Sequence, residues 1–523
     1  MAKLMTRQQR LQIAQQPVAI APPPVGAPIK GWNTRDALTA MDPLDAVQLD
    51  NWYPDTSGIN LRNGYVVYAT GLGSGVVKTV AEYNAGATRK FLGACGGDWF
   101  DISASGPVGS ALASGFSNDA WQYEQFLSNL FFVNGSDNPQ IYNGSTFANA
   151  NFTGSGLTVS SLIGVKQYQQ RLFFWQNNST GFWYAPLNAI SGTLNFFDLS
   201  AFSPGGGNIV NITTYSRDGG NGVLDFIVFV LSSGWALIYY GNDPALATNF
   251  QQIGRYRMAT PVNIRAVTNY GAEAYVTTFD DHVGLSETLQ ALASGRQPPR
   301  SKVSSAVQAA VAANPNAFGW QALYYTKGRR LIFNIPNPDG SFSQHIQNTA
   351  VSYPDPVAST IASPWCRFVG MPASCWGLFK DNLFFGSSGG MVFQADIGSL
   401  DNLGSVAAIG QQAWNTFESP ARKRLTDVRP IVQSFGNLSY TFSVGFDYGN
   451  VNINALVQAS AIGSPWDTSP WDTSPWSPDF SVSTAWLSAG GDGVAVGWTF
   501  NCAATDAVTW LRTDFRGEIG NAL

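Results

Sequence analysis

Short runs of apolar residues, separated by turns rich in glycine, serine and asparagine, recur through most of the chain. The clearest run is a tetrapeptide of Asn or Arg, then Leu, then Phe or Ile, then Phe, which begins at Asn129, Arg171, Arg330 and Asn382. Short apolar runs bounded by turn residues are typical of buried strands. We therefore predict a short strand running into a turn at each of these positions.

The predicted turns follow one another at nearly regular intervals. A propeller blade takes ~40–50 residues and four strands, and only neighbouring blades cover the faces of its sheet. The intervals between the turns are close to this length, so the repeat predicts an all-β fold with a β-propeller of roughly six to eight blades over residues 31–404. The expected turn centres are Gly97, Ser136, Ser179, Gly234, Asp281, Gly340 and Gly389.

Two segments break the repeat because they lack turn signals. Residues 286–294 and 302–313 are rich in Ala, Leu, Val and Gln. This composition favours helices, so we predict a small helical insertion in one blade, near residues 286–313. A further short helix is expected to begin at Asp42-Pro43, because aspartate caps a helix and proline suits its first turn.

The character of the chain changes on both sides of the propeller repeat. Residues 1–30 contain Lys3, Arg7, Arg10 and Lys30 but no acid, and residues 21–28 are rich in proline. This N-terminal arm is either a frayed terminus or a segment that docks on a neighbouring subunit. After the repeat, further predicted strands indicate a C-terminal β-sandwich-like domain over residues 405–523.

A pentapeptide, Trp-Asp-Thr-Ser-Pro, repeats within residues 464–478. Proline at this density excludes the interior of a strand or a helix, so we predict a Trp/Pro-rich loop that projects its indole rings. The three tryptophans are Trp466, Trp471 and Trp476. The loop either packs on its own domain or contacts another subunit or a cell surface.

The overall composition favours a rigid protein whose outer faces meet other subunits. Only 12% of the residues are charged, against the ~25% that is usual, while 45% are hydrophobic. Much of the surface must therefore be covered by uncharged polar residues and glycine. The net charge of −5 gives no overall basic footprint for nucleic acid. A protein that only lets DNA pass needs none, because a basic lumen would retain the strand.

Signals for enzymatic chemistry are weak. Gly386-Ser387-Ser388-Gly389-Gly390 fits the nucleophile-elbow pattern, but both flanks resemble strands, which predicts a hairpin turn instead. Only two histidines, His282 and His345, are present. The four cysteines form no Cys-x-x-Cys pair, and we expect them to be small buried apolar residues. We therefore expect no enzyme activity, no metal and no cofactor.

Carboxylate chemistry is harder to exclude from the sequence. Asp98 and Asp101, or Asp280 and Asp281, could stand with tryptophans in a sugar-binding site. The separation of carboxylates on different blades does not follow from their spacing along the chain. The simplest interpretation of the segment from Asp280 to His282 is an Asx-type turn.

A short basic cluster, Arg422-Lys423-Arg424, begins the C-terminal domain. In an extended strand the two arginines face one side and Lys423 the other. Such charges either protect an edge strand from unwanted pairing or bind an acidic neighbour.

Residues 31–68 resemble the start of the tail nozzle (tail hub) proteins of short-tailed bacteriophages. In that family a Gly-aromatic-Asn-Thr segment precedes an acidic turn, an Asn-aromatic-Pro segment and an Arg-x-Gly-Tyr segment. Weaker similarity continues through residues 170–175 and through the basic cluster and residues 427–430. The residues that match as a family-like assembly motif are Gly31, Trp32, Asn33, Asp45, Asn51, Arg62, Gly64 and Tyr65.

The resemblance implies a non-enzymatic structural protein of the virion. About six identical subunits would form a ring, a homo-oligomer closed by head-to-tail interfaces. The ring would lie below the adaptor in the tail, contact other tail proteins, and let the genome pass during ejection. The subunits would assemble in the host cytoplasm without membrane insertion. Two alternatives stay open: a receptor- or glycan-binding tail protein that uses the Trp/Pro-rich loop, and a carbohydrate-active propeller enzyme.

Overall fold

The structure is a computed structural model that describes residues 21–520, apart from residues 204, 219, 221, 450–451, 454–456 and 460–479. The chain divides into two compact units. One unit is formed by residues up to Arg62 together with Gly404–Leu523, and the other by Asn63–Leu403. Among the described residues, no helix is both long enough and apolar enough to cross a membrane.

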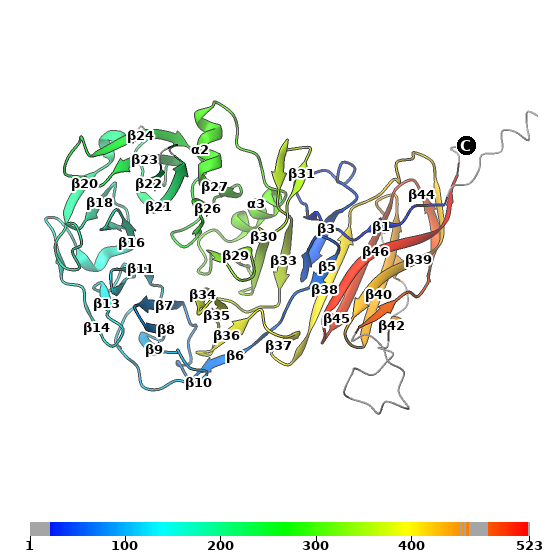
Figure 1. Ribbon diagram of the computed structural model, residues 1–523, viewed down its shortest axis with the longest axis horizontal. Helices are drawn as coiled ribbons and strands as arrows, with labels where there is room; N and C mark the ends of the chain where they lie inside the picture. Colours follow the sequence, from blue (N-terminus) through cyan, green and yellow to red (C-terminus); the bar gives the residue numbers. More distant parts are fainter. Residues whose placement is uncertain are drawn as a thin grey trace, which may run out of the picture. The chain divides into compact units, whose positions relative to one another are not determined.

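The unit Asn63–Leu403 begins with successive antiparallel sheets of three or four strands (Figure 1). The first contains β7 (Thr79–Ala85), β8 (Thr88–Cys95) and β9 (Asp98–Asp101). The second contains β11 (Gln122–Phe126), β12 (Asn129–Val133), β13 (Gln140–Tyr142) and β14 (Phe147–Asn149). The third contains β16 (Leu162–Tyr168), β17 (Arg171–Gln176), β18 (Gly181–Tyr184) and β20 (Asn195–Asp198).

The series continues with the same strand order. The fourth sheet contains β21 (Ile209–Asp218), β22 (Val223–Leu231), β23 (Trp235–Gly241) and β24 (Phe250–Arg257). The fifth contains β25 (Val267–Tyr270), β26 (Glu273–Thr277) and β27 (His282–Gly284). A further group contains β28 (Gln321–Tyr325), β29 (Arg330–Pro336), β30 (Phe342–Asn348) and β33 (Trp365–Val369).

The last strand group joins the two ends of this unit. It contains β34 (Cys375–Phe379), β35 (Asn382–Gly386), β36 (Val392–Ala395) and β6 (Tyr65–Thr70). Because β6 comes from the start of the unit and pairs with β36 from its end, the series of sheets closes into a ring. Figure 1 shows the sheets arranged around a common centre, which is the architecture of a β-propeller. The predicted all-β propeller is thus confirmed.

Apolar side chains fill the spaces between neighbouring sheets. One cluster joins the third and fourth sheets through aromatic rings such as Phe182 and Phe229, whose centroids lie 4.6 Å apart. Another joins the first sheet to the closing group through Phe91 and Phe379, stacked at 5.0 Å. Each sheet therefore buries its faces against its neighbours, as the repeat predicted.

The four predicted tetrapeptide strands are all present as β12, β17, β29 and β35, and each is the second strand of its sheet. A tight turn also precedes each of them, with positive φ at Leu127, Gln170, Arg329 and Asp381. Every predicted turn centre falls between the second and third strands of its sheet.

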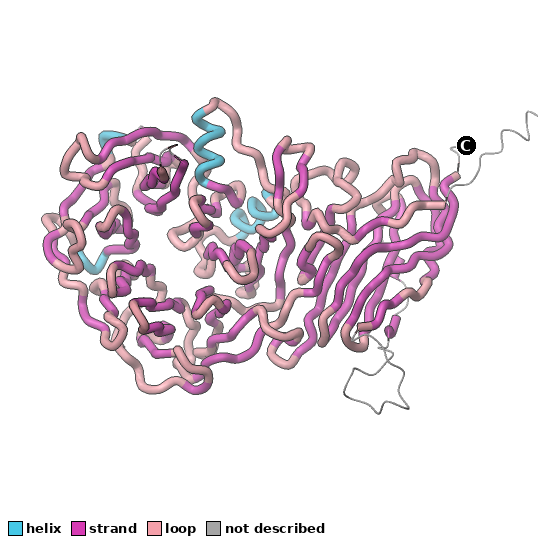
Figure 2. Tube along the Cα trace, in the orientation of Figure 1, coloured by secondary structure: helices cyan, strands magenta, loops and turns pink. Residues whose placement is uncertain are grey.

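Both predicted helices are present between β27 and β28 (Figure 2): α2 spans Leu285–Ala293 and α3 spans Ser304–Ala313. The prediction of a helix at Asp42-Pro43 was wrong. The Asp42 carboxylate accepts the backbone N–H of Leu44 at 2.9 Å, which closes a turn, and a strand begins at Asp45. The aspartate before proline therefore stabilises a turn at this position instead of capping a helix.

The other unit contains two mainly antiparallel sheets. In one, β46 (Val508–Ile519) and β39 (Lys423–Ser434) are central and are joined by β1 (Val25–Gly26), β4 (Trp52–Pro54), β5 (Ile59–Leu61), β43 (Ser481–Ser483) and β44 (Leu487–Gly493). In the other, β38 (Gly404–Gln412), β45 (Val496–Ala504) and β40 (Leu438–Phe446) are joined by β2 (Gly31–Trp32), β3 (Asp45–Asp50), β41 (Asn452–Ile453) and β42 (Val457–Ala459). Trp510 of the first sheet lies 5.4 Å from Phe500 of the second, so aromatic rings pack between them.

Small elements complete the described chain. They are β10 (Gly106–Pro107), β15 (Phe152–Thr153), β19 (Gly192–Thr193), β31 (Tyr353–Asp355), β32 (Thr360–Ala362), β37 (Leu400–Asp401), and two short 3₁₀ helices, Val159–Ser161 and Ser200–Phe202.

The expected domain limits differ from the structure at one end. A propeller over residues 31–404 was expected, and its C-terminal limit agrees with the start of the second unit at Gly404. Residues 31–62, however, supply strands that pair with β38 and β46 of the expected C-terminal domain 405–523. Most of the arm 1–30 lies outside the described residues, although Val25–Gly26 pairs with β46. The loop 464–478 also lies outside them.

Candidate functional site

The first part of the family-like motif forms a buried polar cluster. The Asn33 side-chain amide donates to Asp36 and to Asp45, both at 2.8 Å. The oxygen of the same amide accepts the backbone N–H groups of Arg35 and Asp36 at 3.1 Å. Asp45 is buried, so its carboxylate needs such a partner. This cluster fixes the turn that leads from Gly31-Trp32 toward β3.

A second pair of motif residues joins this segment to the later part of the chain. Arg62, only 3% exposed, donates from Nε to the side-chain oxygen of Asn51 at 2.8 Å. The Asn51 amide in turn donates to the backbone oxygen of Ala407 in β38 at 2.7 Å. Asn51 has φ of 61°, a left-handed conformation that asparagine tolerates better than most residues.

The last two motif residues begin the propeller. A Cβ atom at Gly64 would lie 1.9 Å from the backbone oxygen of Leu400, so only glycine fits there. The ring of Tyr65 meets the rings of Phe385 and Phe393 edge-on, at 5.2 and 5.4 Å. The structure thus brings motif residues together in pairs that organise the fold, and not as one exposed cluster. Trp466, Trp471 and Trp476 lie outside the described residues.

The centre of the propeller is spanned by one arginine. Arg265 lies just before β25 and donates to the backbone oxygens of Lys78 at 2.7 Å and Trp121 at 2.6 Å, and to the Thr79 hydroxyl at 2.7 Å. It therefore connects the fifth sheet to the first and the second. Arg265, Thr79 and Trp121 line a cavity of about 310 Å³ with the first strands of several sheets. Burial lowers the pKa of Arg265.

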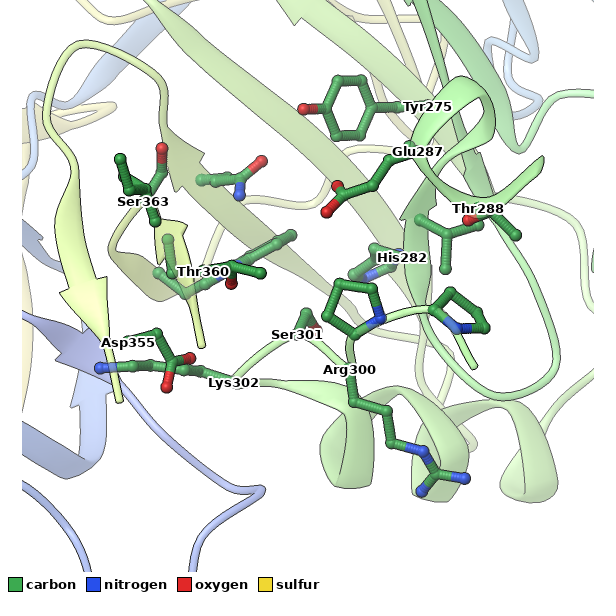
Figure 3. A pocket seen from close by; sticks show the side chains of 18 residues that line it. Tyr275, His282, Glu287, Thr288, Arg300, Ser301, Lys302, Asp355, Thr360 and Ser363 are labelled. Atoms are coloured by element: carbon green, nitrogen blue, oxygen red, sulfur yellow. The ribbon is translucent and has the colours of Figure 1, made fainter. Parts of the chain in front are cut away.

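A second pocket lies between the helical insertion and the strands that follow it (Figure 3). Its volume is about 160 Å³. The side chains of Tyr275 and Glu287 lie on one side of it, while Arg300 points away from them (Figure 3). Burial, and then the neighbouring carboxylate of Glu273, raise the pKa of Glu287. Glu287 was not singled out from the sequence, and its only signal is an acid in the first turn of a predicted helix.

The two histidines of the chain meet beside this pocket. Nε2 of His282 lies 3.2 Å from Nδ1 of His345, and Nδ1 of His282 lies 3.0 Å from the Thr277 hydroxyl. The His282 ring also stacks on Phe333 at 4.0 Å. Burial lowers the pKa of both rings, that of His345 to about 3, so the pair is neutral at pH 7. Because both ring nitrogens of His282 are engaged, the ring is not free to act as a base.

The turn at Asp280 and Asp281 has more hydrogen bonds than an Asx-type turn provides. The Thr278 hydroxyl donates to Asp280 at 2.7 Å, and Asp281 accepts the backbone N–H groups of Ser301 at 2.7 Å and His282 at 2.8 Å. Burial raises the pKa of Asp281 to about 6. Its carboxylate is thus used to attach the segment before α3.

The other candidate acids do not converge on a pocket. Asp101 is held by Lys90 at 2.7 Å and by Ser103 at 2.9 Å. In the described part of the chain, no group of three His, Cys, Asp or Glu residues is placed to hold a metal ion. Glu287 and Asp355 line the pocket of Figure 3, and Glu124 lines the cavity at Arg265.

Three smaller predictions agree with the structure. Residues 386–390 form the hairpin turn between β35 and β36, where Ser387 N–H donates to Met391 oxygen at 2.9 Å. All four cysteines are buried, and none of them forms a disulfide. In the basic cluster, Lys423 faces inward, 0% exposed, while Arg424 is exposed. The strand is not an edge strand, since β39 pairs on both sides, and Arg422 binds Asp492 of the same chain at 2.5 Å.

No protein-family model and no curated protein match this sequence. Solved structures with a similar backbone include BBS1N in complex with ARL6DN, at 10% identity and a TM-score of 0.38, covering 65% of this chain and 99% of that chain. YCF48 from Cyanidioschyzon merolae matches at 11% identity and a TM-score of 0.36, covering 62% and 96%. A glycoside hydrolase family 43 arabinoxylan arabinofuranohydrolase from Bacillus subtilis matches at 10% identity and a TM-score of 0.25, covering 87% of this chain and 96% of that chain.

Proposed function

We propose that this protein is a structural subunit of the tail nozzle ring of a short-tailed bacteriophage. The proposal rests on the structural roles of the residues in the family-like motif. Asn33 binds Asp45, Asn51 binds Arg62, and Gly64 occupies a position that has no room for a side chain. Residues with such roles are needed to build this arrangement of strands, so their joint occurrence supports common architecture with the family they resemble.

We also propose a finer description of the fold. The seven strand groups of Asn63–Leu403 are seven propeller blades, the last closed by β6. The two sheets of the other unit form a β-sandwich, with Trp52, Phe500 and Trp510 between them. Aromatic packing of this kind makes a stiff unit, which suits a part that must hold a bore of fixed width.

The proposed mechanism is mechanical. Rigid β-units, arranged head to tail around a channel in the tail, hold the channel open or closed with their loops while the genome passes. A chain with 12% charged residues has little tendency to retain DNA electrostatically. The partners are further copies of the chain, about six per ring, the phage adaptor and other tail proteins.

The solution mass tests this proposal. Light scattering of the purified protein, with and without the neighbouring adaptor protein, should give a closed oligomer in at least one condition. A strict monomer in both conditions would overturn the ring. Electron micrographs of the oligomer should show a ring with a central opening, and an open filament would equally contradict a closed nozzle.

A second candidate function is glycan binding, as a receptor-binding tail protein or as a carbohydrate-active propeller enzyme. The pocket of Figure 3 favours it, because Glu287, Tyr275 and several hydroxyl side chains converge on a space of about 160 Å³. Calorimetry against host-surface saccharides, and a search for released reducing ends, test binding and turnover separately. If Glu287→Gln leaves any observed binding or turnover unchanged, this pocket is not the site.

A further inference from the structure

An apolar groove lies on one face of the propeller, next to Arg265, because the Arg265 acceptor Lys78 also lines the groove. It has a volume of about 590 Å³ and is formed by turns that belong to the last two strand groups and by the segment before β7. Its apolar lining consists of Val76, Phe318, Phe342, Val369, Met371 and Pro372. Val76 is 38% exposed, and Phe318 and Phe342 are partly exposed. A groove of this size and character suits an apolar segment of a protein.

The groove carries one positive charge and no negative one. Lys78 is its only charged lining residue, and its ammonium group lies 5.8 Å from the centre of the Phe318 ring. Across the described residues, no carboxylate forms an ion pair with Lys78. The occupant that fits best therefore combines large apolar side chains with negative charge.

The Trp-Asp-Thr-Ser-Pro repeat of residues 464–478 has this combination. It offers an indole and a proline every five residues, accompanied by Asp467 and Asp472, and it contains no lysine or arginine. Proline-rich segments commonly dock in grooves lined by aromatic side chains, because little conformational entropy is lost when they bind. Tryptophan is also the side chain that most often dominates the binding energy of an interface.

We propose that residues 464–478 of one subunit dock in the apolar groove of a neighbouring copy. The indoles cover Phe318, Phe342 and Met371, and an aspartate of the repeat pairs with Lys78. The groove and the repeat would then form the two halves of a head-to-tail contact that generates a ring. This inference rests on the proposed nozzle function, because it requires neighbouring copies of the chain.

Photo-crosslinking tests the contact and identifies the occupant. Ser388 lines the groove and is exposed, so p-benzoylphenylalanine introduced there would attach to whatever fills the groove. The full-length protein is assembled from a mixture of ¹⁵N-labelled and unlabelled chains, and crosslinked peptides are identified by mass spectrometry. We expect crosslinks to residues 464–478 that join labelled to unlabelled peptides. The same probe at Ser145, an exposed residue of another sheet, should give none to this segment.

Two variants test the chemistry of the contact. Lys78→Glu should lower the yield of these crosslinks ~tenfold, since reversing one charge of a desolvated pair costs at least that factor in affinity. Trp466→Ala combined with Trp471→Ala should lower the yield by a similar or larger factor. An unchanged yield in both variants would overturn the proposal.

The remaining outcomes separate this inference from the nozzle function. If a ring forms but the crosslinks lead to another segment, or to none, the docking proposal fails while the ring stands. Crosslinks only within chains of one isotope label mean that the segment occupies its own subunit's groove, which also overturns the proposal. A monomer without crosslinks contradicts both.

Discussion

Nε of Arg62 donates to the side-chain oxygen of Asn51 at 2.8 Å, and through Asn51 this buried arginine is connected to the backbone of Ala407. The two ends of the unit, separated by the whole propeller in sequence, are therefore joined by one side chain. Asn51 also holds a left-handed backbone conformation, φ 61°. One residue thus has two structural roles that can be measured separately.

Replacing Asn51 should destabilise this unit in two steps. Asn51→Gly removes the hydrogen bonds but accepts the positive φ, and should cost ~2–3 kcal/mol, because buried Arg62 loses a partner. Asn51→Ala adds backbone strain and should cost ~1 kcal/mol more. Hydrogen exchange of the β38 and β46 amides measures both losses. A glycine variant as stable as the wild type would show that the hydrogen bonds contribute nothing.

Arg265 should act as a link between three propeller sheets. Arg265→Met keeps the bulk of the side chain but leaves the Lys78 and Trp121 oxygens without their donor. We expect a loss of ~2–4 kcal/mol in local stability, seen as faster hydrogen exchange in β7 and β11. Arg255→Met, at an exposed position of β24, is the control and should change stability by less than ~0.5 kcal/mol. Equal effects of the two substitutions would refute the link.

The elements that the sequence predicted correctly are those that local pattern determines. The runs at Asn129, Arg171, Arg330 and Asn382 became second strands because at least three consecutive apolar residues between turns leave few alternatives. The two helices were predictable because residues 286–294 and 302–313 lack turn signals. Turn chemistry at Asp42 was misjudged, since its carboxylate could cap a helix or close a turn, and the strand pairing of Asp45–Asp50 decided between them.

The parts that could not be predicted depend on residues far apart in the chain. Strands β3 and β5 pair with strands more than 350 residues later, and no local pattern encodes such a partner. Arg265 reaches Lys78 across 187 positions, and the two histidines meet across 63. The motif residues were identified through resemblance alone, and their pairwise contacts became visible only in the structure. The apolar groove likewise combines turns that are separate in sequence.

Gly64 should tolerate no side chain. A Cβ atom there would meet Leu400 oxygen at 1.9 Å, so Gly64→Ala must displace the backbone where the propeller closes. We expect a loss of ~2–4 kcal/mol or more, typical of steric overpacking at a rigid site. The matched control is Gly109→Ala, where a Cβ atom would meet nothing within 4 Å. Urea unfolding of the two variants gives the comparison, and equal midpoints would contradict it.

The neutral histidine pair should make the propeller sensitive to acid. Burial lowers the pKa of His345 to about 3, whereas the value in the unfolded chain is 6.5. The contribution of the neutral His345 ring to the free energy of unfolding is therefore complete above pH 6.5 and is lost as the pH falls toward 3. Between pH 7 and 4.5 this loss is ~2–3 kcal/mol. His345→Gln cannot titrate, so its stability should fall by that much less over the same interval, as measured by hydrogen exchange in β30. Parallel pH profiles would contradict the assignment.

Asp281 should have the opposite pH dependence. Burial raises its pKa to about 6 from 3.8, so its favourable contribution is present below pH 3.8 and is lost as the pH rises through 6. Asp281→Asn removes the titration but keeps only one of the two oxygens that accept the Ser301 and His282 backbone N–H groups, so its stability is lower at every pH and the comparison rests on the shape of the pH profile. Relative to this variant, the wild type should lose ~2 kcal/mol between pH 4.5 and 7, seen in exchange of the α3 and β27 amides.

Because the histidine pair gains stability over the same interval, the variant should be destabilised by acid more steeply than the wild type. If the variant and the wild type have the same profile, Asp281 is already ionised in the folded protein at pH 4.5, and the attachment of the segment before α3 is charge-assisted throughout.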